Sequence, residues 1–301
     1  MNDPRLDHRQ VRRAFARAAS SYERHDALQR EVEARLFDRL DYYDGKPERV
    51  LDVGCGTGRG TALLKKRWPN AEVIALDLSP AMLHEARRHA GWWKPFARVC
   101  ADGQQLPFPD CSIDAVYSNL CLQWCETPRP MLAECARVLR PGGFLAASSL
   151  GPDTLSELRA AWAEADPERP HVGRFLDLHD IGDAALAAGL KDPVLDADHI
   201  TLGYPDVRGL FADLKGLGAT NADRGRTPGL TGKGHFQTML DAYETRRRGG
   251  RIPATWEVIA LHAWGFPAGA MPLYGGRETR FEVISRRKRG GGSRQDDAGG
   301  V

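Results

Sequence analysis

The chain has 301 residues, of which 42% are hydrophobic and 27% charged, and this suits a globular protein with one large domain or two small ones. A formal net charge of +2 gives no overall indication of nucleic-acid binding. No stretch approaches the length of a membrane span and the N-terminus lacks the apolar core of a secretory signal, so we expect a cytoplasmic protein without a membrane partner.

Residues 1–45 are predicted to form an N-terminal helical lid. Apolar residues recur there at the spacing that one face of a helix requires. They are Val11, Phe15, Ala18 and Tyr22, and a second stripe contains Leu28, Val32 and Leu36. Arginines crowd the same segment, and on charge alone a solvated helix face explains them better than a docking patch. They are Arg5, Arg9, Arg12, Arg13 and Arg17.

Residues 46–150 alternate between strand-like and helix-like segments, which is the pattern of a parallel sheet covered by helices. Helices are expected to begin near Gly58, after Ser79 and after Thr127. The segment "RVLRPGGFLAASS" reads as a helix end, a Pro-Gly-Gly turn and a buried strand. The predicted strands are Arg49 to Val53, Glu72 to Asp77, Ala97 to Ala101, Ile113 to Ser118 and Phe144 to Ser149.

Residues 151–265 contain helical patches and Gly- and Pro-rich loops, followed by two strand candidates that can rejoin the sheet, "HITLGY" and "ATWEVIALHAWG". We assign this region to a substrate or lid insertion and the last strands. Residues 266–301 form a C-terminal extension, whose end has almost nothing apolar to bury and is expected to be disordered.

All six cysteines fall between Cys55 and Cys135. They form no CxxC pair and have no neighbouring histidine, so neither a metal site nor a disulfide framework is predicted. Buried, reduced thiols explain them better.

The segment "VLDVGCGTGRG" (50–60) places a glycine-rich turn directly after an apolar strand. Such a turn brings the backbone close to a ligand, and the next helix offers unpaired N–H groups. Gly54, Gly56 and Gly58 read G-x-G-x-G, whereas a dinucleotide site favours G-x-G-x-x-G. The carboxylate of Asp52 suits an ammonium or sulfonium ligand better than a pyrophosphate. For the loop taken by itself, a structural turn without a ligand is the alternative interpretation.

Two further acids follow strands of the same predicted sheet. Asp77 ends the second strand, where open α/β sheets place a carboxylate that holds ribose hydroxyls. Asp102 follows the third strand and can accept a hydrogen bond from an adenine amine. Either acid alone could cap a helix or stabilise a turn. Three acids at one sheet edge are harder to explain by turns.

The motifs "VLDVGCGTG", "VIALDLSPAML", "ADGQQLPFPDCSIDAVYSNL" and "RVLRPGGFL" resemble the class I S-adenosylmethionine methyltransferases. The resemblance implies an α/β fold with a Rossmann-like seven-stranded sheet whose last strand is antiparallel, with S-adenosyl-L-methionine as the cofactor. It places Asp77 on the ribose, Asp102 on the adenine and Asn119 beside the methyl group. The implied cofactor-binding residues are Asp52, Gly54, Cys55, Gly56, Gly58, Asp77, Leu78, Asp102, Gly103 and Asn119.

The flanking segments are similar to the malonyl-acyl-carrier-protein O-methyltransferases of early biotin synthesis. The similar segments are "VRRAFARAASSYERHDALQREV", "SNLCLQWC", "RPHVGRF", "LKGLGATN" and "PATWEVIALHAWG", within roughly residues 10 to 265. This resemblance implies that the sheet carries an N-terminal helical lid and a helical insertion before the last strands, and that malonyl-loaded acyl carrier protein is the partner. The chain departs from the family after Gly265.

The implied chemistry needs little from the protein beyond alignment. A malonyl carboxylate has a pKa of roughly 3 to 4, so it is ionised at neutral pH and needs no general base. The resemblance favours a catalytic role for Tyr22, whose hydroxyl would bond the carboxylate, although a helix-stripe residue fits the spacing equally well. Trp124 is a candidate apolar wall, and Arg174 and Lys215 are candidates for binding the carboxylate or the carrier's phosphate. A core tryptophan and solvated cations are the alternatives.

Three other functions stay open on the sequence alone. The acceptor could be another small carboxylic acid or a quinone precursor. The chain could also be a relative that modifies or assists a protein partner. From a different class, it could be a binding module that holds S-adenosylmethionine without turning it over.

Overall fold

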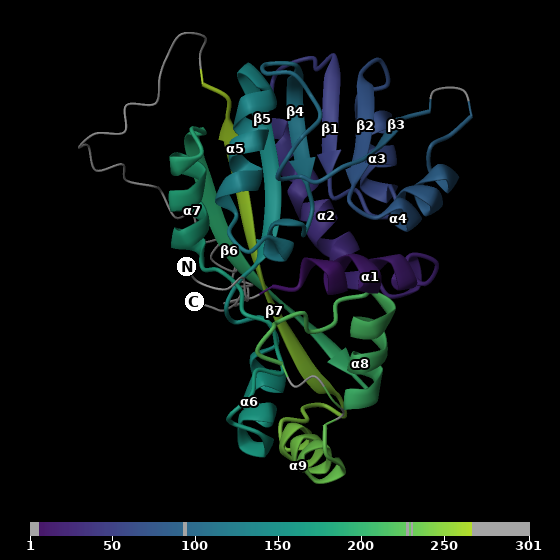
Figure 1. The fold of residues 1–301 in the computed structure, drawn as a ribbon, viewed down its shortest axis with the longest axis vertical. Coiled ribbons are helices and arrows are strands. Elements are labelled where there is room, and N and C mark those ends of the chain that lie inside the picture. Colours follow the sequence, from purple (N-terminus) through teal and green to yellow (C-terminus); the bar gives the residue numbers. More distant parts are fainter. Residues whose placement is uncertain (1–5, 93–94, 227–228, 230, 267–301) are drawn as a thin grey trace, which may run out of the picture.

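The computed structural model describes residues 6–92, 95–226, 229 and 231–266, so the expected disorder at the C-terminal end lies outside the described residues. Seven strands form one sheet in the order β3-β2-β1-β4-β5-β7-β6 (Figure 1). Strand β7 runs antiparallel to β5 and β6, and the other paired strands run parallel. The predicted sheet is confirmed. Its strands are β1 (Arg49–Val53), β2 (Glu72–Asp77), β3 (Ala97–Cys100), β4 (Ile113–Ser118), β5 (Leu139–Leu150), β6 (Lys191–Tyr204) and β7 (Ile252–Trp264).

Strands β1, β2 and β4 have the predicted bounds, whereas β5 begins five residues earlier than expected, at Leu139 instead of Phe144. The predicted Pro-Gly-Gly turn is therefore wrong. Gly142 has a φ of +74°, and the register between β4 and β5 shifts at Ile113 and Ala115. An irregularity of this kind absorbs residues that cannot fit a regular ladder and lets the strand continue.

Helices cover both faces of the sheet. On one face, α5 (Arg129–Val138) and α7 (Leu178–Ala187) bury apolar side chains against the strands. On the other face, α2 (Ala27–Arg39) and α3 (Arg59–Arg67) do the same. Helix α4 (Pro80–Glu85) follows β2. The short 3-10 helices are η1 (Tyr22–Arg24), η2 (Leu40–Tyr42), η3 (Ala86–Arg88) and η4 (Leu122–Trp124).

The N-terminal segment is more than the predicted lid. Leu36 of α2 and the adjoining Leu40 are each 1% exposed and pack in the same apolar cluster as Val50 of β1 and Phe144 of β5. Burial of side chains of this size contributes roughly 1.5 to 3 kcal/mol each. Helix α2 is thus part of the helical layer on the sheet, and only α1 (His8–Ala18) crosses the sheet edge as a cover (Figure 1).

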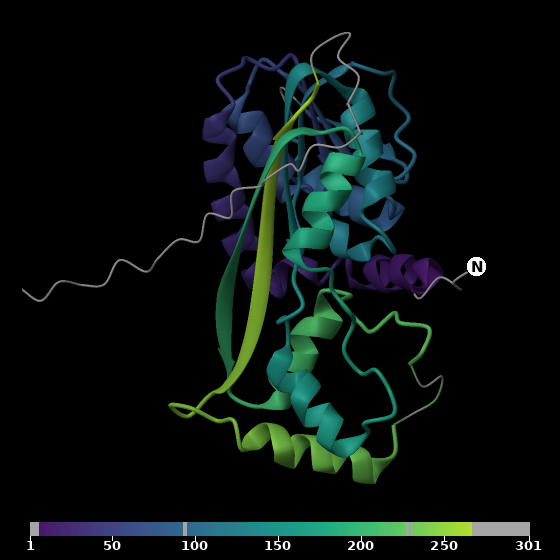
Figure 2. The same ribbon diagram turned by 90° about the vertical axis from the view of Figure 1, so that its left-hand side faces the viewer.

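Strands β6 and β7 extend beyond the rest of the sheet and carry a second group of helices, as both ribbon views show (Figure 1; Figure 2). Pairing of β5 with β7 ends at Leu150 and Val258, while β6 and β7 stay paired as far as Tyr204 and Ile252. We call this extension, with α6 (Ser156–Ala165), α8 (Val207–Gly216) and α9 (Lys233–Glu244), the distal lobe. The predicted insertion is therefore divided, with helices before β6 and between β6 and β7.

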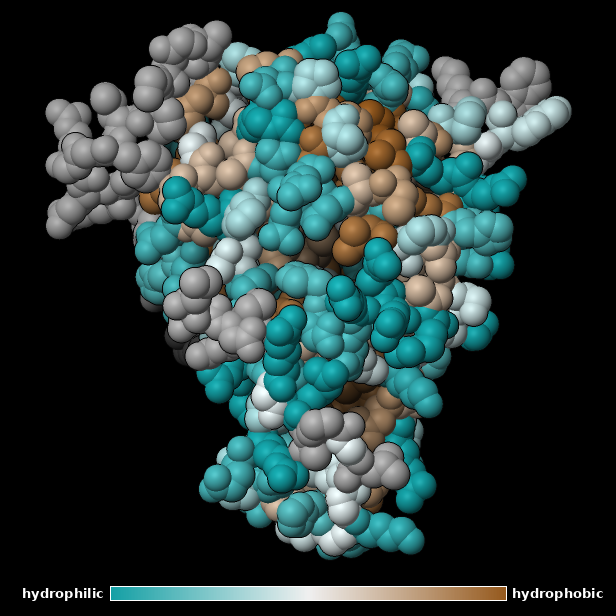
Figure 3. Space-filling view, in the orientation of Figure 1, coloured by the Kyte–Doolittle hydropathy of each residue, from teal (hydrophilic) through white to brown (hydrophobic). Residues whose placement is uncertain are grey.

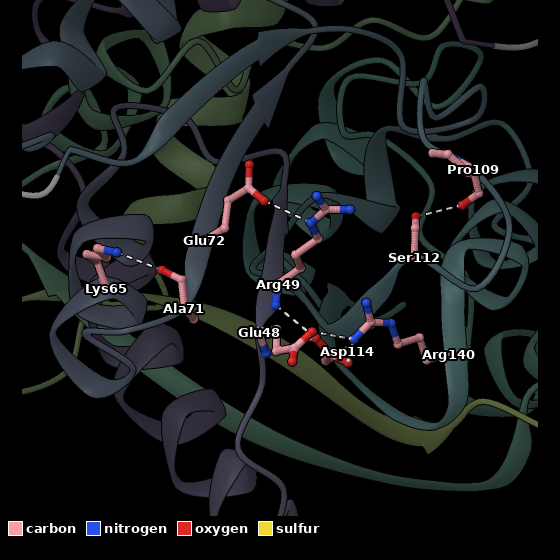
Figure 4. Close-up of polar contacts among 9 residues, drawn as sticks. All are labelled: Glu48, Arg49, Lys65, Ala71, Glu72, Pro109, Ser112, Asp114 and Arg140. Carbon is pink, nitrogen blue, oxygen red and sulfur yellow. Dashed lines mark hydrogen bonds and ion pairs between the residues drawn. The ribbon is translucent and has the colours of Figure 1, made fainter.

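The amino edge of the sheet is held by polar contacts (Figure 4). Asp114 accepts hydrogen bonds from the backbone N–H of Arg49 at 2.8 Å and from the guanidinium of Arg140 at 2.8 Å. The side chain of Arg49 pairs with Glu72 at 2.8 Å, which joins β1 to β2. These contacts belong to sheet assembly and lie at the opposite edge from the ends of the parallel strands that carry the site.

Across the described residues, no helix is long and apolar enough to cross a membrane.

Candidate active site

The candidate site lies at the carboxyl edge of the sheet, where β1, β2, β3 and β4 end and α1 crosses toward the distal lobe (Figure 1). The loop after β1 is attached to the neighbouring strand, because the backbone N–H groups of Gly54 and Cys55 donate to the carbonyl of Leu76 at 2.8 and 3.0 Å. This edge is where open α/β sheets bind their ligands.

Asp77 connects the glycine loop to the start of α4. Its Oδ2 accepts a hydrogen bond from the backbone N–H of Gly56 at 3.0 Å, and its Oδ1 accepts one from the N–H of Ser79 at 2.8 Å. Burial raises the pKa of Asp77 to about 6, although the two N–H groups oppose that rise. Each carboxylate oxygen keeps a lone pair for a further donor, such as a ribose hydroxyl.

The three glycines of the loop are all left-handed, with φ values of +74° at Gly54, +55° at Gly56 and +82° at Gly58. A Cβ at the first would lie 2.5 Å from Cys121 Sγ, and one at the third would lie 2.7 Å from the Cβ of Ala86. A Cβ at Gly56 would meet nothing within 4 Å. Packing therefore requires the outer two glycines, while the middle one borders open space in which a ligand can approach the backbone.

A cavity of about 100 Å³, here called the cofactor cavity, lies beneath α1. Its wall joins residues from the loop after β1, the ends of β2, β4 and β5, and the helices α1 and α2. Six residues predicted from the sequence line it: Tyr22, Gly54, Gly56, Asp77, Asn119 and Trp124.

Tyr22 and Asn119 contribute polar groups to this cavity. Burial, followed by the charges of Asp26 and Asp77, raises the pKa of Tyr22 well above its usual range, so the phenol keeps its proton and can donate. The side chain of Asn119 is fixed at both ends: its Nδ2 donates to the Gln29 carbonyl at 3.1 Å, and its Oδ1 accepts from the hydroxyl of Ser148 at 2.9 Å.

Asp52 does not line the cofactor cavity, and its expected place beside a cationic ligand stays a prediction. It is 2% exposed, and its Oδ2 accepts a hydrogen bond of 2.5 Å from the hydroxyl of Thr61 on α3. Burial raises its pKa to about 7, Thr61 lowers it, and the nearby charges of Glu33 and Asp77 raise it further. Thr61 of α3 and Glu33 of α2 therefore lie near the Asp52 carboxylate at the end of β1.

Five other predicted positions also lie outside the walls of both cavities described here. They are Cys55, Gly58, Leu78, Asp102 and Gly103. Leu78 is 38% exposed, and Asp102 accepts a hydrogen bond from the N–H of Gln104 at 2.9 Å, as a turn residue would. The backbone N–H of Ala101 donates to the carbonyl of Asp77 at 3.2 Å, which keeps Asp102 at the same sheet edge. Their contacts to a cofactor remain predictions.

A larger cavity of about 830 Å³, here called the acceptor cavity, lies between the sheet edge and the distal lobe. Arg174 and Lys215 line it, as does Trp124. Trp124 also lines the cofactor cavity and packs edge-on against Phe15 of α1, with ring centroids 5.0 Å apart.

On the outer face of the molecule, hydrophilic residues predominate. Hydrophobic residues are visible in patches, one of them in the distal lobe (Figure 3).

The two cavities share one wall, formed by residues from η4, β5, β7 and the loop after α8. They are Gln123, Trp124, Leu150, Ala219 and Trp256. Sequence reasoning identified only Trp124 among them. The motifs "SNLCLQWC", "LKGLGATN" and "PATWEVIALHAWG" contain the others except Leu150, but nothing in a linear motif tells which of its side chains face a cavity.

Asp153, His199 and Glu257 form an exposed group on the distal lobe, with ligand-type atoms within 4.8 Å of one another. Contacts inside the group account for this geometry, because His199 Nε2 lies 3.2 Å from Asp153 Oδ2 and the N–H of Asp153 donates to Glu257 Oε2 at 2.8 Å. We assign no ligand to it.

Residues 51–147 match a family model described as a methyltransferase domain. A malonyl-[acyl-carrier protein] O-methyltransferase of Xylella fastidiosa (strain M23) is 47% identical over 277 residues, which cover 91% of this chain and 92% of the relative. Another, of Gallionella capsiferriformans (strain ES-2), is 45% identical over 270 residues, or 88% and 93% of the two chains. The fold is similar to that of the YcgJ protein of Bacillus subtilis, with a TM-score of 0.54, 19% identity, and coverage of 77% of this chain and 98% of the other. Because the two relatives match along almost their whole length, the chain belongs to the malonyl-[acyl-carrier protein] O-methyltransferase family of S-adenosylmethionine-dependent enzymes.

Proposed function

We propose that this protein transfers a methyl group from S-adenosylmethionine to the free carboxylate of a malonyl thioester on acyl carrier protein, and that the methyl ester formed primes the pimeloyl chain of biotin. The activity for which the two relatives are named supports this acceptor. The six cysteines, all present as thiols, suit the reducing cytoplasm in which we place the reaction.

The observation that carries the proposal is the pair of adjoining cavities with different chemistry. The cofactor cavity is bordered by backbone and by the Asp77 carboxylate, and the open space over Gly56 fits a ligand that meets the chain at its backbone. The acceptor cavity has mostly apolar walls, and its charged residues include Arg174 and Lys215 beside Glu126 and Asp223. A donor and an acceptor bound in these cavities would meet at the shared wall.

The methyl transfer itself makes few chemical demands on the chain. S-Adenosylmethionine supplies a methyl group that a carboxylate oxygen takes directly, while the electron pair of the broken S–C bond stays on sulfur and no proton moves. The protein must therefore align the two reactants and exclude water, and alignment of this kind can lower a barrier by roughly 7 to 11 kcal/mol. Tyr22 can donate a hydrogen bond to the carboxylate without exchanging a proton with it.

Arg174 and Lys215 are the arginine and the lysine in the lining of the acceptor cavity, which also contains the carboxylates of Glu126 and Asp223, so an anion would bind beside one of the cations and not anywhere in the cavity. The cavity is large enough for more than a malonyl group, so one cation can meet the carboxylate and the other a more distant anionic or carbonyl group of the thioester arm. Arg174 lies outside the wall that the two cavities share, so it can meet the carboxylate or the carrier's phosphate only from the acceptor side, and the carboxylate oxygen that faces the methyl group stays free of it.

The direct test is incubation with labelled S-adenosylmethionine and malonyl-loaded carrier protein, followed by mass spectrometry of the product. We expect a single methyl ester on the malonyl group. Transfer to a free carboxylic acid or a quinone precursor, with none to the malonyl thioester, would establish the alternative acceptors. Binding without transfer to any of these acceptors would contradict the proposal.

Arg174 can be tested with a matched arginine outside the cavity. Arg174→Gln is expected to raise the KM for the malonyl thioester roughly tenfold or more, because a charge-assisted pair is lost. Arg159→Gln is the control, since Arg159 lies close enough to influence charge in this region but does not line the acceptor cavity. Equal KM values in the two variants would remove Arg174 from the acceptor site.

A further inference from the structure

Several buried polar atoms around the site lack hydrogen-bond partners. In the part of the chain that the structure describes, the buried side-chain atoms without a partner are Gln29 Oε1, Ser79 Oγ, Tyr117 Oη, Gln123 Oε1 and Trp256 Nε1. Gln29, Gln123 and Trp256 all line the cofactor cavity. Buried polar groups in folded proteins are nearly always paired with protein, water or ligand, so these three atoms mark places where a bound ligand can complete the hydrogen bonding.

Trp256 is the only donor among these three unpaired groups. The residue is 5% exposed and belongs to the apolar cluster of the distal lobe, together with Leu150 and Val258. Its indole N–H can only donate, and a buried tryptophan N–H usually finds an acceptor. The ring lies on the wall that separates the cofactor cavity from the acceptor cavity.

The position of this wall identifies the group that the indole meets. A methyl group that passes from one cavity to the other must cross where the two adjoin, so the reacting carboxylate has to lie against the shared wall. Leu150 and Ala219 offer no polar side-chain atom there, and the indole N–H of Trp124, unlike that of Trp256, is not among the buried atoms that lack a partner in the described residues. Gln123 already donates its Nε2 to the Leu120 carbonyl at 2.7 Å, and its unpaired atom is an oxygen, which would repel a carboxylate.

We propose that Nε1 of Trp256 donates a hydrogen bond to the malonyl carboxylate oxygen that is not methylated, and so selects acceptors that end in a carboxylate. This inference rests on the proposed malonyl acceptor. A neutral donor replaces one of the hydrogen bonds that the carboxylate loses with its water, and this offsets part of the cost of burying the charge. It also fixes one oxygen, which leaves the other free to face the methyl group, and it neutralises the nucleophile less than a cation would.

The first experiment observes the indole directly. Protein labelled with ¹⁵N and saturated with S-adenosylhomocysteine, which prevents turnover, is titrated with malonyl-coenzyme A or with acetyl-coenzyme A, which lacks the carboxylate. The Trp256 indole resonance is assigned by its absence from Trp256→Phe or, if that variant does not fold, from Trp256→Tyr. We expect a downfield shift of its proton with the malonyl compound only. The same shift with both compounds, or no shift at saturating malonyl-coenzyme A, would overturn the proposal.

The second experiment measures turnover. Trp256→Phe keeps an aromatic ring but loses the donor, and kcat/KM for malonyl-carrier protein should fall roughly 10- to 100-fold, as expected for a hydrogen bond to a charged group. The affinity for S-adenosylmethionine, measured by calorimetry, should stay unchanged. Trp264→Phe is the matched control on the same strand, since Trp264 packs on Phe144 at 5.3 Å, outside both cavities.

The outcomes separate this inference from the proposed function. A wild-type protein that methylates no malonyl thioester would refute the function itself. A wild-type protein that does so, with Trp256→Phe as active as Trp264→Phe, would leave the function in place and refute the role of Trp256.

Discussion

The sheet edge and the distal lobe are built in different ways, although they face each other across one shared wall. At the sheet edge the contacts come from backbone groups close together in sequence, such as the Gly56 N–H on Asp77. The acceptor cavity joins side chains from segments far apart, with Arg174 in the loop between α6 and α7, Lys215 in α8 and Trp256 in β7. Changes at the sheet edge should therefore affect cofactor affinity, and changes in the lobe should affect acceptor use.

The largest effect is expected from Gly56→Val. Its side chain would enter the open space above the loop, where no protein atom lies within 4 Å, and should abolish S-adenosylmethionine binding as measured by calorimetry. Gly142→Val is the control, because Gly142 also has a positive φ of +74° and an open surrounding but lies in β5 at the amino edge. Both variants carry similar backbone strain, so a loss of binding in both would indicate general destabilisation instead of a blocked site.

A smaller loss is expected from Asp77→Ala. Removal of a charged acceptor should weaken S-adenosylmethionine binding by ~1.5 to 3 kcal/mol per lost hydrogen bond. Because the folded ligand-free protein holds the pKa of Asp77 at about 6, the carboxylate is ionised at pH 8 and protonated at pH 5. Affinity should therefore fall as the pH is lowered through 6, and Asp77→Asn should remove this dependence.

Asp52 provides the control for that pH profile. Its pKa of about 7 is close to that of Asp77, but its carboxylate is buried against Thr61, outside the wall of the cofactor cavity. Asp52→Asn should keep the fall in affinity near pH 6. If the dependence disappears in Asp52→Asn and persists in Asp77→Asn, the assignments of the two carboxylates must be exchanged.

The sequence predicts the sheet edge better than the lobe for a physical reason. The bounds of β1, β2 and β4 follow from short apolar runs and from the residues that end them, all local signals. The extent of β5 was misjudged because a Pro-Gly-Gly segment usually ends an element, and only pairing with β4 shows that the strand passes through it. The surroundings of Asp52 likewise depend on tertiary packing, which brings Thr61 of α3 and Glu33 of α2 close to its carboxylate.

The residues that line the acceptor cavity could not be predicted from local sequence patterns. Arg174 and Lys215 were candidates only through resemblance, since nothing in composition or spacing distinguishes them from solvated cations. Leu150 and Trp256 are about a hundred residues apart in the chain and share a wall because β5 and β7 pair antiparallel. The unpaired Trp256 donor is visible only when the surroundings of the indole are known.

Tyr22→Phe tests whether a residue at the sheet edge, in the wall of the cofactor cavity, acts on the acceptor. Tyr22 lines the cofactor cavity, but we assign its hydroxyl to the acceptor carboxylate, so the variant should lower kcat about tenfold and leave S-adenosylmethionine affinity nearly unchanged. Tyr42→Phe serves as the control, since Tyr42 is 61% exposed and stacks on His262 away from both cavities. Equal losses of turnover and affinity in Tyr22→Phe would instead indicate that the cover formed by the N-terminal segment has collapsed.

The smallest effect is expected from charge on the outer face of α1. Arg9, Arg12, Arg13 and Arg17 are exposed on the helix that lies over the site, and Phe15 of the same helix packs on Trp124. Carrier proteins are acidic, so these arginines should raise the encounter rate, and this effect is screened beyond roughly 8 to 10 Å at physiological salt. The double variant Arg12→Glu with Arg13→Glu should therefore lower kcat/KM severalfold for malonyl-carrier protein at low salt, and less for malonyl-coenzyme A.

The control for this prediction is the double variant Lys46→Glu with Lys66→Glu. It changes the net charge equally at the far edge of the sheet and should have little effect on either substrate. If both double variants lose activity alike, the net charge alone governs the encounter. Normal activity of the α1 variant on the carrier substrate would mean that these arginines only form a solvated helix face. The docking surface would then have to be sought near Lys215 or near Arg246, Arg247 and Arg248.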